Sequence, residues 1–123
     1  MFTAKTFVPV SPADGDIVAT GGRLTVPLLL EAYSLGIFPW YEEGETILWW
    51  SPDPRAILEL PSFHVSKSLA RTVRSGRFRV TFDEDFEGVI AGCAESNRGG
   101  TWITREMTSA YIELHHQIGR AHV

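Results

Sequence analysis

The sequence predicts a mixed α/β fold. Short apolar or alternating runs typical of strands are interspersed with longer segments whose apolar residues recur at the 3.6-residue period of a helix. With 123 residues, the chain can bury one modest core but not two full ones. Its content of 44% hydrophobic and 21% charged residues excludes a collagenous or low-complexity chain.

The first predicted helix runs from about Val26 to Leu35. Thr25 is a candidate N-cap, Pro27 is tolerated in a first turn, and Gly36 supplies a C-terminal stop. Because this helix is apolar on most sides, we expect it in the core. The aromatic segment 37–41 that follows is too rich in large side chains for a simple solvent loop, so it packs or binds a ligand.

Three segments have the composition of strands. Thr46–Trp50 is rich in large apolar residues and ends where Pro52 and Pro54 stop a ladder, and we expect a subdomain boundary there. Ala56–Leu60 and Phe78–Phe82 alternate apolar and polar residues. These segments predict a sheet.

Three further helices are predicted. The first covers about Val65 to Ser75 and is closed by Gly76. The second follows acidic residues 83–85, and its apolar stripe consists of Phe86, Val89, Ile90, Cys93 and Ala94. The third begins at the N-cap Thr104 and ends at Gly119, and its stripe consists of Met107, Ala110, Tyr111, Leu114 and Ile118. Residues 120–123 resemble the start of a strand.

Positive charge is concentrated in one segment. The net charge is −4, but Pro61–Phe82 holds five bases and no acid. On a helical wheel, Lys67, Arg71 and Arg74 share one face, and Arg77 and Arg79 lie just beyond the helix. The opposite, apolar face is expected to dock on the core; its residues are Val65, Leu69 and Val73. The cationic face has the pattern of a phosphate-backbone contact, and a solvated helix face is the alternative.

Aromatic residues offer stacking surfaces for unpaired bases. They are Trp40, Tyr41, Trp49, Trp50, Trp102 and Tyr111. Neighbours on a strand point to opposite faces, so one of Trp49 and Trp50 is expected in the core and the other available. Trp102 precedes a helix, where a ring lines a cleft or packs in the core.

Familiar catalytic and metal-binding sets are missing. The four histidines and Cys93 do not have zinc-ligand spacing, and no Ser-His-Asp pattern is recognisable. Cys93 is the single cysteine, on an apolar helix stripe, so we expect a buried inert thiol and no intramolecular disulfide. No membrane segment or secretory signal is visible, which indicates a cytoplasmic protein.

Ordered motifs along the chain resemble a known family. They are residues 31–33, 36–41, 47–55, 64–69, 78–81, 89–94, 101–104, 110–111, 114–115 and 119–122. In this order they resemble the bacterial leucyl/phenylalanyl-tRNA–protein transferases from about Gly21 to the last residue. Segments 36–40 and 49–55 are long and unusual, which makes the resemblance strong.

The resemblance implies a tRNA-contacting role for the basic helix. Lys67, Arg71 and Arg74 match the family's cationic positions. Ser75 stands where a further base is expected, which shifts that phosphate contact to Arg77.

The resemblance also implies a site for the end of an aminoacyl-tRNA. Trp40 matches a ring that stacks on the 3′-terminal adenosine, and Tyr33 matches a tyrosine near the reacting ester. Trp102 and Tyr111 match residues that line the amino-acid pocket.

The implied reaction is transfer of Leu or Phe from aminoacyl-tRNA to a protein with N-terminal Lys or Arg, which marks that protein for degradation. It is the aminolysis of an ester and needs no metal or other cofactor. Family members are about twice as long, and their carboxylate and glutamine credited with assisting the amine lie in the part that this chain lacks. We therefore expect the 123-residue chain itself to be inactive or nearly so.

The implied fold is α+β with two parts. Residues 1–52 form a small N-terminal α/β domain, and residues 53–123 form the first part of an acetyltransferase-like (GNAT-like) domain that carries the basic helix. Two alternatives remain open at this point: a non-catalytic module that binds a tRNA acceptor arm, and an inactive fragment. The oligomeric state is also open.

Overall fold

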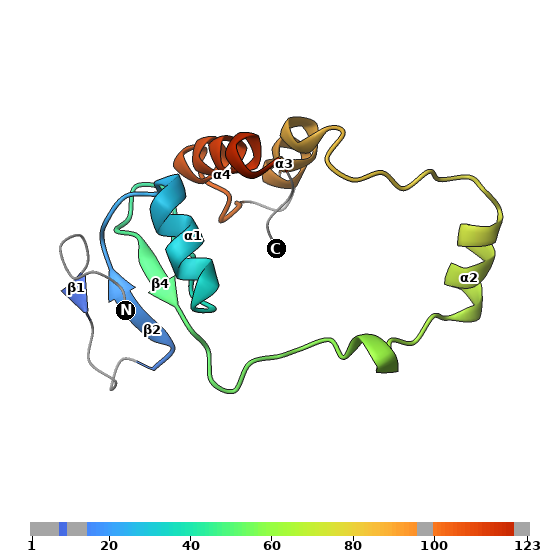
Figure 1. The fold of residues 1–123 in the computed structure, drawn as a ribbon, viewed down its shortest axis with the longest axis horizontal. Helices are drawn as coiled ribbons and strands as arrows, with labels where there is room; N and C mark the ends of the chain where they lie inside the picture. Colours follow the sequence, from blue (N-terminus) through green and yellow to red (C-terminus); the bar gives the residue numbers. More distant parts are fainter. Residues whose placement is uncertain (1–7, 10–14, 96–99, 120–123) are drawn as a thin grey trace.

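The computed structural model describes residues 8–9, 15–95 and 100–119, and it has the mixed α/β fold that the sequence predicts (Figure 1). Its four strands pair antiparallel in the order β1-β2-β4-β3; they are β1 (Val8–Pro9), β2 (Ile17–Thr20), β3 (Phe38–Pro39) and β4 (Leu48–Trp50). Its α-helices are α1 (Val26–Ser34), α2 (Lys67–Arg74), α3 (Phe86–Ala94) and α4 (Arg105–Ile118).

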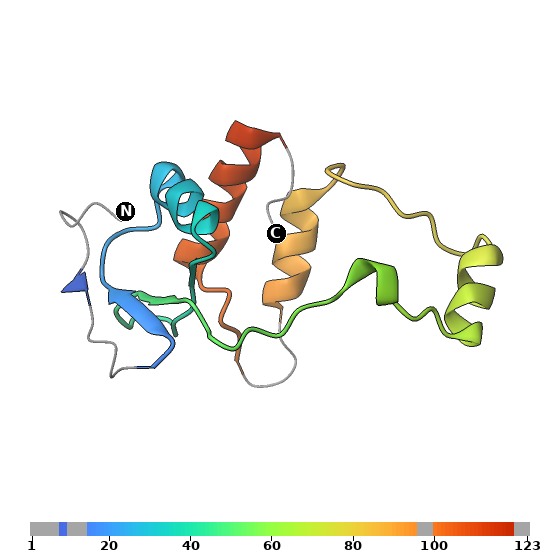
Figure 2. The same cartoon turned by 60° about the horizontal axis from the view of Figure 1, so that its bottom comes forward.

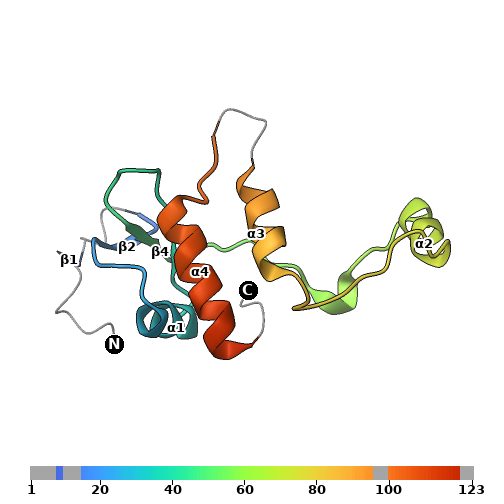
Figure 3. The same cartoon turned by 90° about the horizontal axis from the view of Figure 1, so that it is seen from above.

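The core lies between the sheet, α1 and α4. Trp49 on β4 is 0% exposed, and its indole N–H donates to the carbonyl of Gly21 at 3.0 Å. Leu29 of α1 and Met107 of α4 are also fully buried in this cluster. Seen from above, α1 and α4 lie side by side next to the sheet (Figure 3). Residues on both sides of the expected boundary near Asp53 therefore share one core.

Helix α1 ends in a motif that aims the following turn. Gly36 has φ +71°, and its N–H donates to the carbonyl of Tyr33 at 3.0 Å. The N–H of Ile37 donates to the carbonyl of Ala32 at 2.9 Å. This pair of bonds is a Schellman motif, in which glycine adopts the left-handed conformation at no steric cost. The aromatic segment 37–41 thus leaves the helix in a fixed direction.

The N-terminus of α4 is tied to the segment after β3. The hydroxyl of Thr104 accepts from the N–H of Met107 at 3.0 Å, which confirms the predicted N-cap. The N–H of Arg105 donates to the carboxylate of Glu43 at 3.2 Å. A carboxylate there is favoured by the helix dipole. Together with the shared core, these bonds fix α4 against the N-terminal elements.

Two predicted strands are wrong. Residues 56–60 and 78–82 are not in strands; a short 3₁₀-helix occupies Leu60–Ser62. Ile57 is 76% exposed and Phe82 is 85% exposed. Alternating sequences form a ladder only beside a partner, and no strand of the described residues adjoins these segments. They form instead the two sides of an extended arm that carries α2 at its far end (Figures 1 and 2).

The arm also corrects the predicted docking of the basic helix. Helix α2 forms where expected, with Ser66 as its N-cap, but none of its residues is buried. The apolar side chains of Val65, Leu69 and Val73 are exposed. The helix stands apart from the core because the extended segments hold it away from the sheet (Figure 3).

Helix α3 is only partly covered. Ile90 is its one buried residue, and the Phe86 ring stacks on His115 of α4 with 4.4 Å between centroids. Cys93 is exposed, so the expectation of a buried thiol is wrong. Packing against α4 buries fewer residues of α3 than the predicted apolar stripe contains.

Other differences are small. The predicted strand Thr46–Trp50 begins at Leu48 as β4, and the sequence reading missed β1, β2 and β3. The expected strand start at residues 120–123 lies outside the described residues. No described helix is long and apolar enough to cross a membrane.

Candidate functional site

A cavity of about 700 Å³ lies between α1, β3 and the start of α4. Side chains far apart in the sequence line it: Tyr33, Gly36, Ile37, Phe38, Pro39, Trp40, Arg55, Trp102 and Tyr111. The structure therefore brings together Tyr33, Trp40, Trp102 and Tyr111, to which the resemblance gives three different roles. Gly36 and Ile37 of the Schellman motif belong to this lining, so the end of α1 directly shapes the cavity.

Two tyrosines from different helices meet in the cavity. The hydroxyls of Tyr33 on α1 and Tyr111 on α4 are hydrogen-bonded, and their rings meet edge to face with 6.3 Å between centroids. Burial is the main cause that raises the pKa of both phenols above the usual value. Neutral phenols donate hydrogen bonds but do not accept protons at neutral pH. One O–H of the pair is used in the mutual hydrogen bond, so the pair can present at most one O–H to a carbonyl or hydroxyl oxygen.

Three indoles form the other side of the site. The centroid of the Trp40 ring lies 6.1 Å from the centroid of the Trp102 ring and 6.5 Å from that of the Trp50 ring. The Trp50 indole N–H donates to the carbonyl of Trp40 at 2.8 Å and so holds the backbone of the turn. Trp40 is 53% exposed and Trp102 is 47% exposed, so both keep ring surface available for stacking. The prediction for the Trp49-Trp50 pair is confirmed, since Trp49 is buried and Trp50 is partly exposed.

Arg55 is a lining residue that sequence reasoning did not single out as a site. Its Nη2 donates to the carbonyl of Gly36 at 2.5 Å, and its guanidinium lies 5.7 Å from the centroid of the Phe38 ring. Among the described lining residues it is the only charged one. The sequence around Arg55 carries no signal of this contact, because the contact depends on packing against Gly36, 19 residues earlier in the chain.

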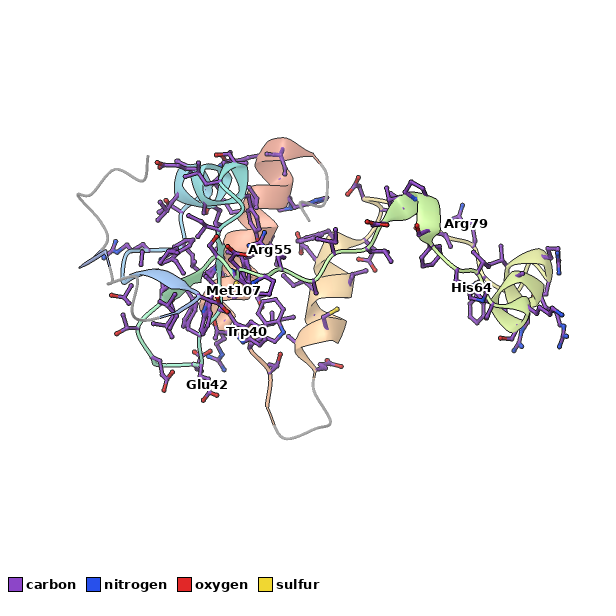
Figure 4. All side chains as sticks on the ribbon, turned by 90° about the horizontal axis from the view of Figure 1, so that it is seen from below. Trp40, Glu42, Arg55, His64, Arg79 and Met107 are labelled. Atoms are coloured by element: carbon purple, nitrogen blue, oxygen red, sulfur yellow. The ribbon has the colours of Figure 1, made fainter. Side chains whose placement is uncertain are left out.

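The cationic residues of the arm lie apart from the cavity. Lys67, Arg71, Arg74 and Arg77 are exposed, and none forms an ion pair within the described part of the chain. Arg79 pairs with Glu84 at 3.3 Å. Figure 4 shows Arg79 on the arm and Trp40 away from the arm, among the elements around the sheet. The two predicted contact regions are thus separate surfaces.

The cavity has a limited chemical repertoire. Among the described residues that line it, none is a carboxylate or an imidazole. The described residues also contain no group of three or more His, Cys, Asp or Glu side chains that could hold a metal ion. The described lining can stack on rings, donate hydrogen bonds from phenols and bind an anion, but none of its side chains is suited to accept a proton.

Alkaline titration tests the tyrosine environments. Burial raises the pKa of Tyr41 to about 12, and the pKa values of the cavity tyrosines, the other two in the chain, are raised as well. Unfolded tyrosine ionises near pH 10. The native state then binds more protons above pH 10, so the free energy of unfolding is expected to fall as pH rises from about 10 to about 12.

Tyrosinate absorbance checks this expectation. In the folded protein it should stay low at pH 10 and rise only at higher pH, whereas in denaturant it should rise near pH 10. Superimposable titration curves with and without denaturant would contradict the buried positions of the phenols.

Sequence comparisons match most of the chain to one family. The family model described as leucyl/phenylalanyl-tRNA protein transferase matches residues 57–123, and the model of that family's N-terminal domain matches residues 22–53. The chain is similar to proteins named leucyl/phenylalanyl-tRNA–protein transferase. One from Pseudomonas fluorescens (strain Pf0-1) is 50% identical over 122 residues, which is 95% of this chain and 54% of that protein.

Two further relatives have the same name and similar coverage. The protein from Anaeromyxobacter sp. (strain Fw109-5) is 55% identical over 109 residues, with 86% of this chain and 46% of the relative covered. The protein from Magnetococcus marinus is 51% identical over 120 residues, with 96% and 51% covered. The chain thus spans about half the length of the relatives that it matches.

Proposed function

Because the chain belongs to the leucyl/phenylalanyl-tRNA protein transferase family, we propose that it takes part in transferring Leu or Phe from aminoacyl-tRNA to a protein with N-terminal Lys or Arg. Such a transfer marks the acceptor for degradation in the cytoplasm. One observation carries the proposal: Tyr33, Trp40, Trp102 and Tyr111, which the family resemblance singles out, surround one cavity.

The cavity is suited to the end of an aminoacyl-tRNA. The exposed face of Trp40 is available for the 3′-terminal adenosine, and base stacking on an aromatic ring contributes about 1 to 3 kcal/mol. Trp102 and Tyr111 would line the space for the apolar Leu or Phe side chain. A buried phenol such as Tyr33 is suited to donate to the ester oxygen as negative charge develops on it.

The chemistry requires more than this cavity provides. The α-amine of the acceptor attacks the ester carbonyl, the new C–N bond forms, and the bond to the ribose oxygen breaks. The amine loses a proton and the ribose oxygen gains one. No described lining side chain is a carboxylate or an imidazole, so the described part of the cavity does not supply the group that accepts the proton. We assign it to the part of the relatives that this chain does not span.

Helix α2 is proposed as the contact to the tRNA phosphates. Lys67, Arg71 and Arg74 lie within one 8-residue helix, exposed and without ion-pair partners among the described residues. Arg77 follows just beyond the helix. Exposed cations without acidic neighbours can bind phosphates without breaking an ion pair within the protein, and the binding releases counterions from the nucleic acid. A long tRNA acceptor arm could contact both this helix and the separate cavity.

The finer fold proposal is a two-part architecture. Residues 1–52 would form a small N-terminal domain that shares its core with α4, and residues 53–123 would begin an acetyltransferase-like domain. The meeting of the two family models between residues 53 and 57 supports this division. Support for an incomplete second domain comes from the exposed apolar side chains of Ile57 and Phe82 on the arm, which further strands would cover.

A non-catalytic binding module is the second candidate. It is favoured by the lack of a proton acceptor among the described lining residues, because stacking and phosphate contacts alone bind tRNA without chemistry. The two candidates differ in whether transfer appears when the rest of the family's length is supplied.

Complementation tests the enzymatic proposal. The chain is mixed with a second polypeptide made of the part of the Pseudomonas fluorescens relative that it does not match, together with Phe-tRNA and a peptide beginning with Arg. Mass spectrometry is expected to find Phe on the peptide with both polypeptides and little or none with either alone.

The controls separate the outcomes. The same peptide with an acetylated N-terminus has no free amine and should remain unmodified. A covalent fusion of the two polypeptides removes the requirement for association. If this fusion binds Phe-tRNA but transfers nothing, the binding-module candidate holds and the enzymatic one fails; full activity of the 123-residue chain alone would contradict a proton acceptor outside it.

A further inference from the structure

We propose that Arg55 forms a phosphate-binding subsite of the cavity, which holds the phosphate ester of an adenosine whose base stacks on Trp40. This inference rests on the proposed function, since it names the group beside the terminal adenosine. The chemistry is shared by two sources: the internucleotide phosphate that precedes the 3′-terminal adenosine of a tRNA, and the monoester of a free nucleotide.

The charge in the cavity favours an anion. Arg55 is the only charged residue among those described in the lining, and no carboxylate there offsets it. It forms no ion pair within the described part of the chain. A guanidinium remains protonated at any pH at which proteins fold. Two of its N–H groups can donate in parallel to two oxygens of one phosphate. The cavity therefore presents one permanent, unneutralised cation.

The guanidinium is held in place before any ligand arrives. Its Nη2 donates to the carbonyl of Gly36 at 2.5 Å, and the Phe38 ring lies beneath it at 5.7 Å. That bond uses one of the five N–H groups, so several donors remain for a phosphate. Because the side chain is already ordered, binding costs less conformational entropy than it would for a free surface arginine.

The position of Arg55 fits a nucleotide better than an isolated anion. Arg55 and Trp40 line the same cavity, and both lie at the sheet end of the molecule in Figure 4. His64 and Arg79 lie on the arm in the same view. A stacking ring and a fixed cation in one cavity match the base and the phosphate of one ligand. The subsite is thus distinct from the phosphate contacts proposed for α2.

Calorimetric titration of the 123-residue chain with adenosine, AMP and the dinucleotide CpA tests the subsite. AMP and CpA are expected to bind roughly 10- to 100-fold more tightly than adenosine, as for a charge-assisted hydrogen-bonded pair. The preference should shrink with added salt. A gain by both ligands identifies the tRNA end as the source, and a gain by AMP alone identifies a free nucleotide.

Two glutamine variants assign the preference to its residue. Arg55→Gln is expected to bring AMP and adenosine to equal affinity while adenosine affinity stays unchanged, which also shows that the cavity is intact. Arg23→Gln, which removes the same charge from an exposed residue outside the cavity, should keep the full preference.

Several results would overturn the subsite. They are equal affinity of the unchanged protein for AMP and adenosine, no detectable AMP binding, and a preference that survives in Arg55→Gln. If aminoacyl-tRNA binds while AMP shows no preference, only the subsite fails. If AMP preference is present but aminoacyl-tRNA does not bind, the proposed function fails and the subsite stands.

Discussion

Replacing Trp49 with alanine is expected to lower the free energy of unfolding by about 3 to 5 kcal/mol, the range for deleting a large buried aromatic side chain. Trp49 is fully buried between the sheet and the two core helices. Its loss leaves a large cavity and removes the indole donor from the Gly21 carbonyl. Since small domains have a total stability of about 5 to 15 kcal/mol, the variant should be largely unfolded or close to it.

The neighbouring tryptophan provides the matched control. Trp50→Ala removes the same atoms from the next residue of β4, but that side chain is partly exposed and its N–H bonds the Trp40 carbonyl at the rim. Urea denaturation should therefore show a clearly smaller loss for Trp50→Ala than for Trp49→Ala. Equal losses, or a larger loss at Trp50, would contradict the assignment of Trp49 to the core.

Features set by local interactions could be predicted from the sequence. Thr104 caps α4 and Gly36 ends α1 because each choice depends on a few adjacent backbone groups. Strand alternation predicts that one of Trp49 and Trp50 is buried, although it does not identify Trp49 as the buried one. The four α-helices could be predicted for the same reason, because the helical period of the apolar residues is a property of each segment by itself.

Features set by distant partners could not be predicted. Strands β1 and β3 have two residues each and exist only through pairing with β2 and β4. Conversely, residues 78–82 alternate apolar and polar side chains but have no partner strand among the described residues. Strand formation depends on a neighbour that periodicity does not identify.

The candidate site shows the same limit. Tyr33 and Tyr111 were singled out by resemblance, but their hydrogen bond depends on the packing of α1 against α4. Arg55 contacts the Gly36 carbonyl across the sheet edge, and nothing in its own segment indicates that contact. The sequence therefore identifies most residues of the site but not the contacts between them.

The triple variant Lys67→Ala, Arg71→Ala, Arg74→Ala is expected to lose most of the salt-dependent part of tRNA binding. If the three cations hold three phosphates, the plot of log affinity against log salt becomes shallower by about 2 to 3. The unchanged chain should then lose roughly 40-fold more affinity than the variant between about 50 and 200 mM salt. Fluorescence anisotropy with labelled tRNA measures both slopes.

Charge, rather than the shape of the arm, should account for this loss. Alanine is the best helix former, and none of the three side chains is buried, so α2 should persist in the variant. A control with Lys67→Arg, Arg71→Lys and Arg74→Lys keeps all three charges and should keep the slope. Because the cavity lies apart from α2, adenosine affinity should be unchanged in both variants. An unchanged slope in the alanine variant would remove α2 from the tRNA contact and leave its cations as a solvated helix face.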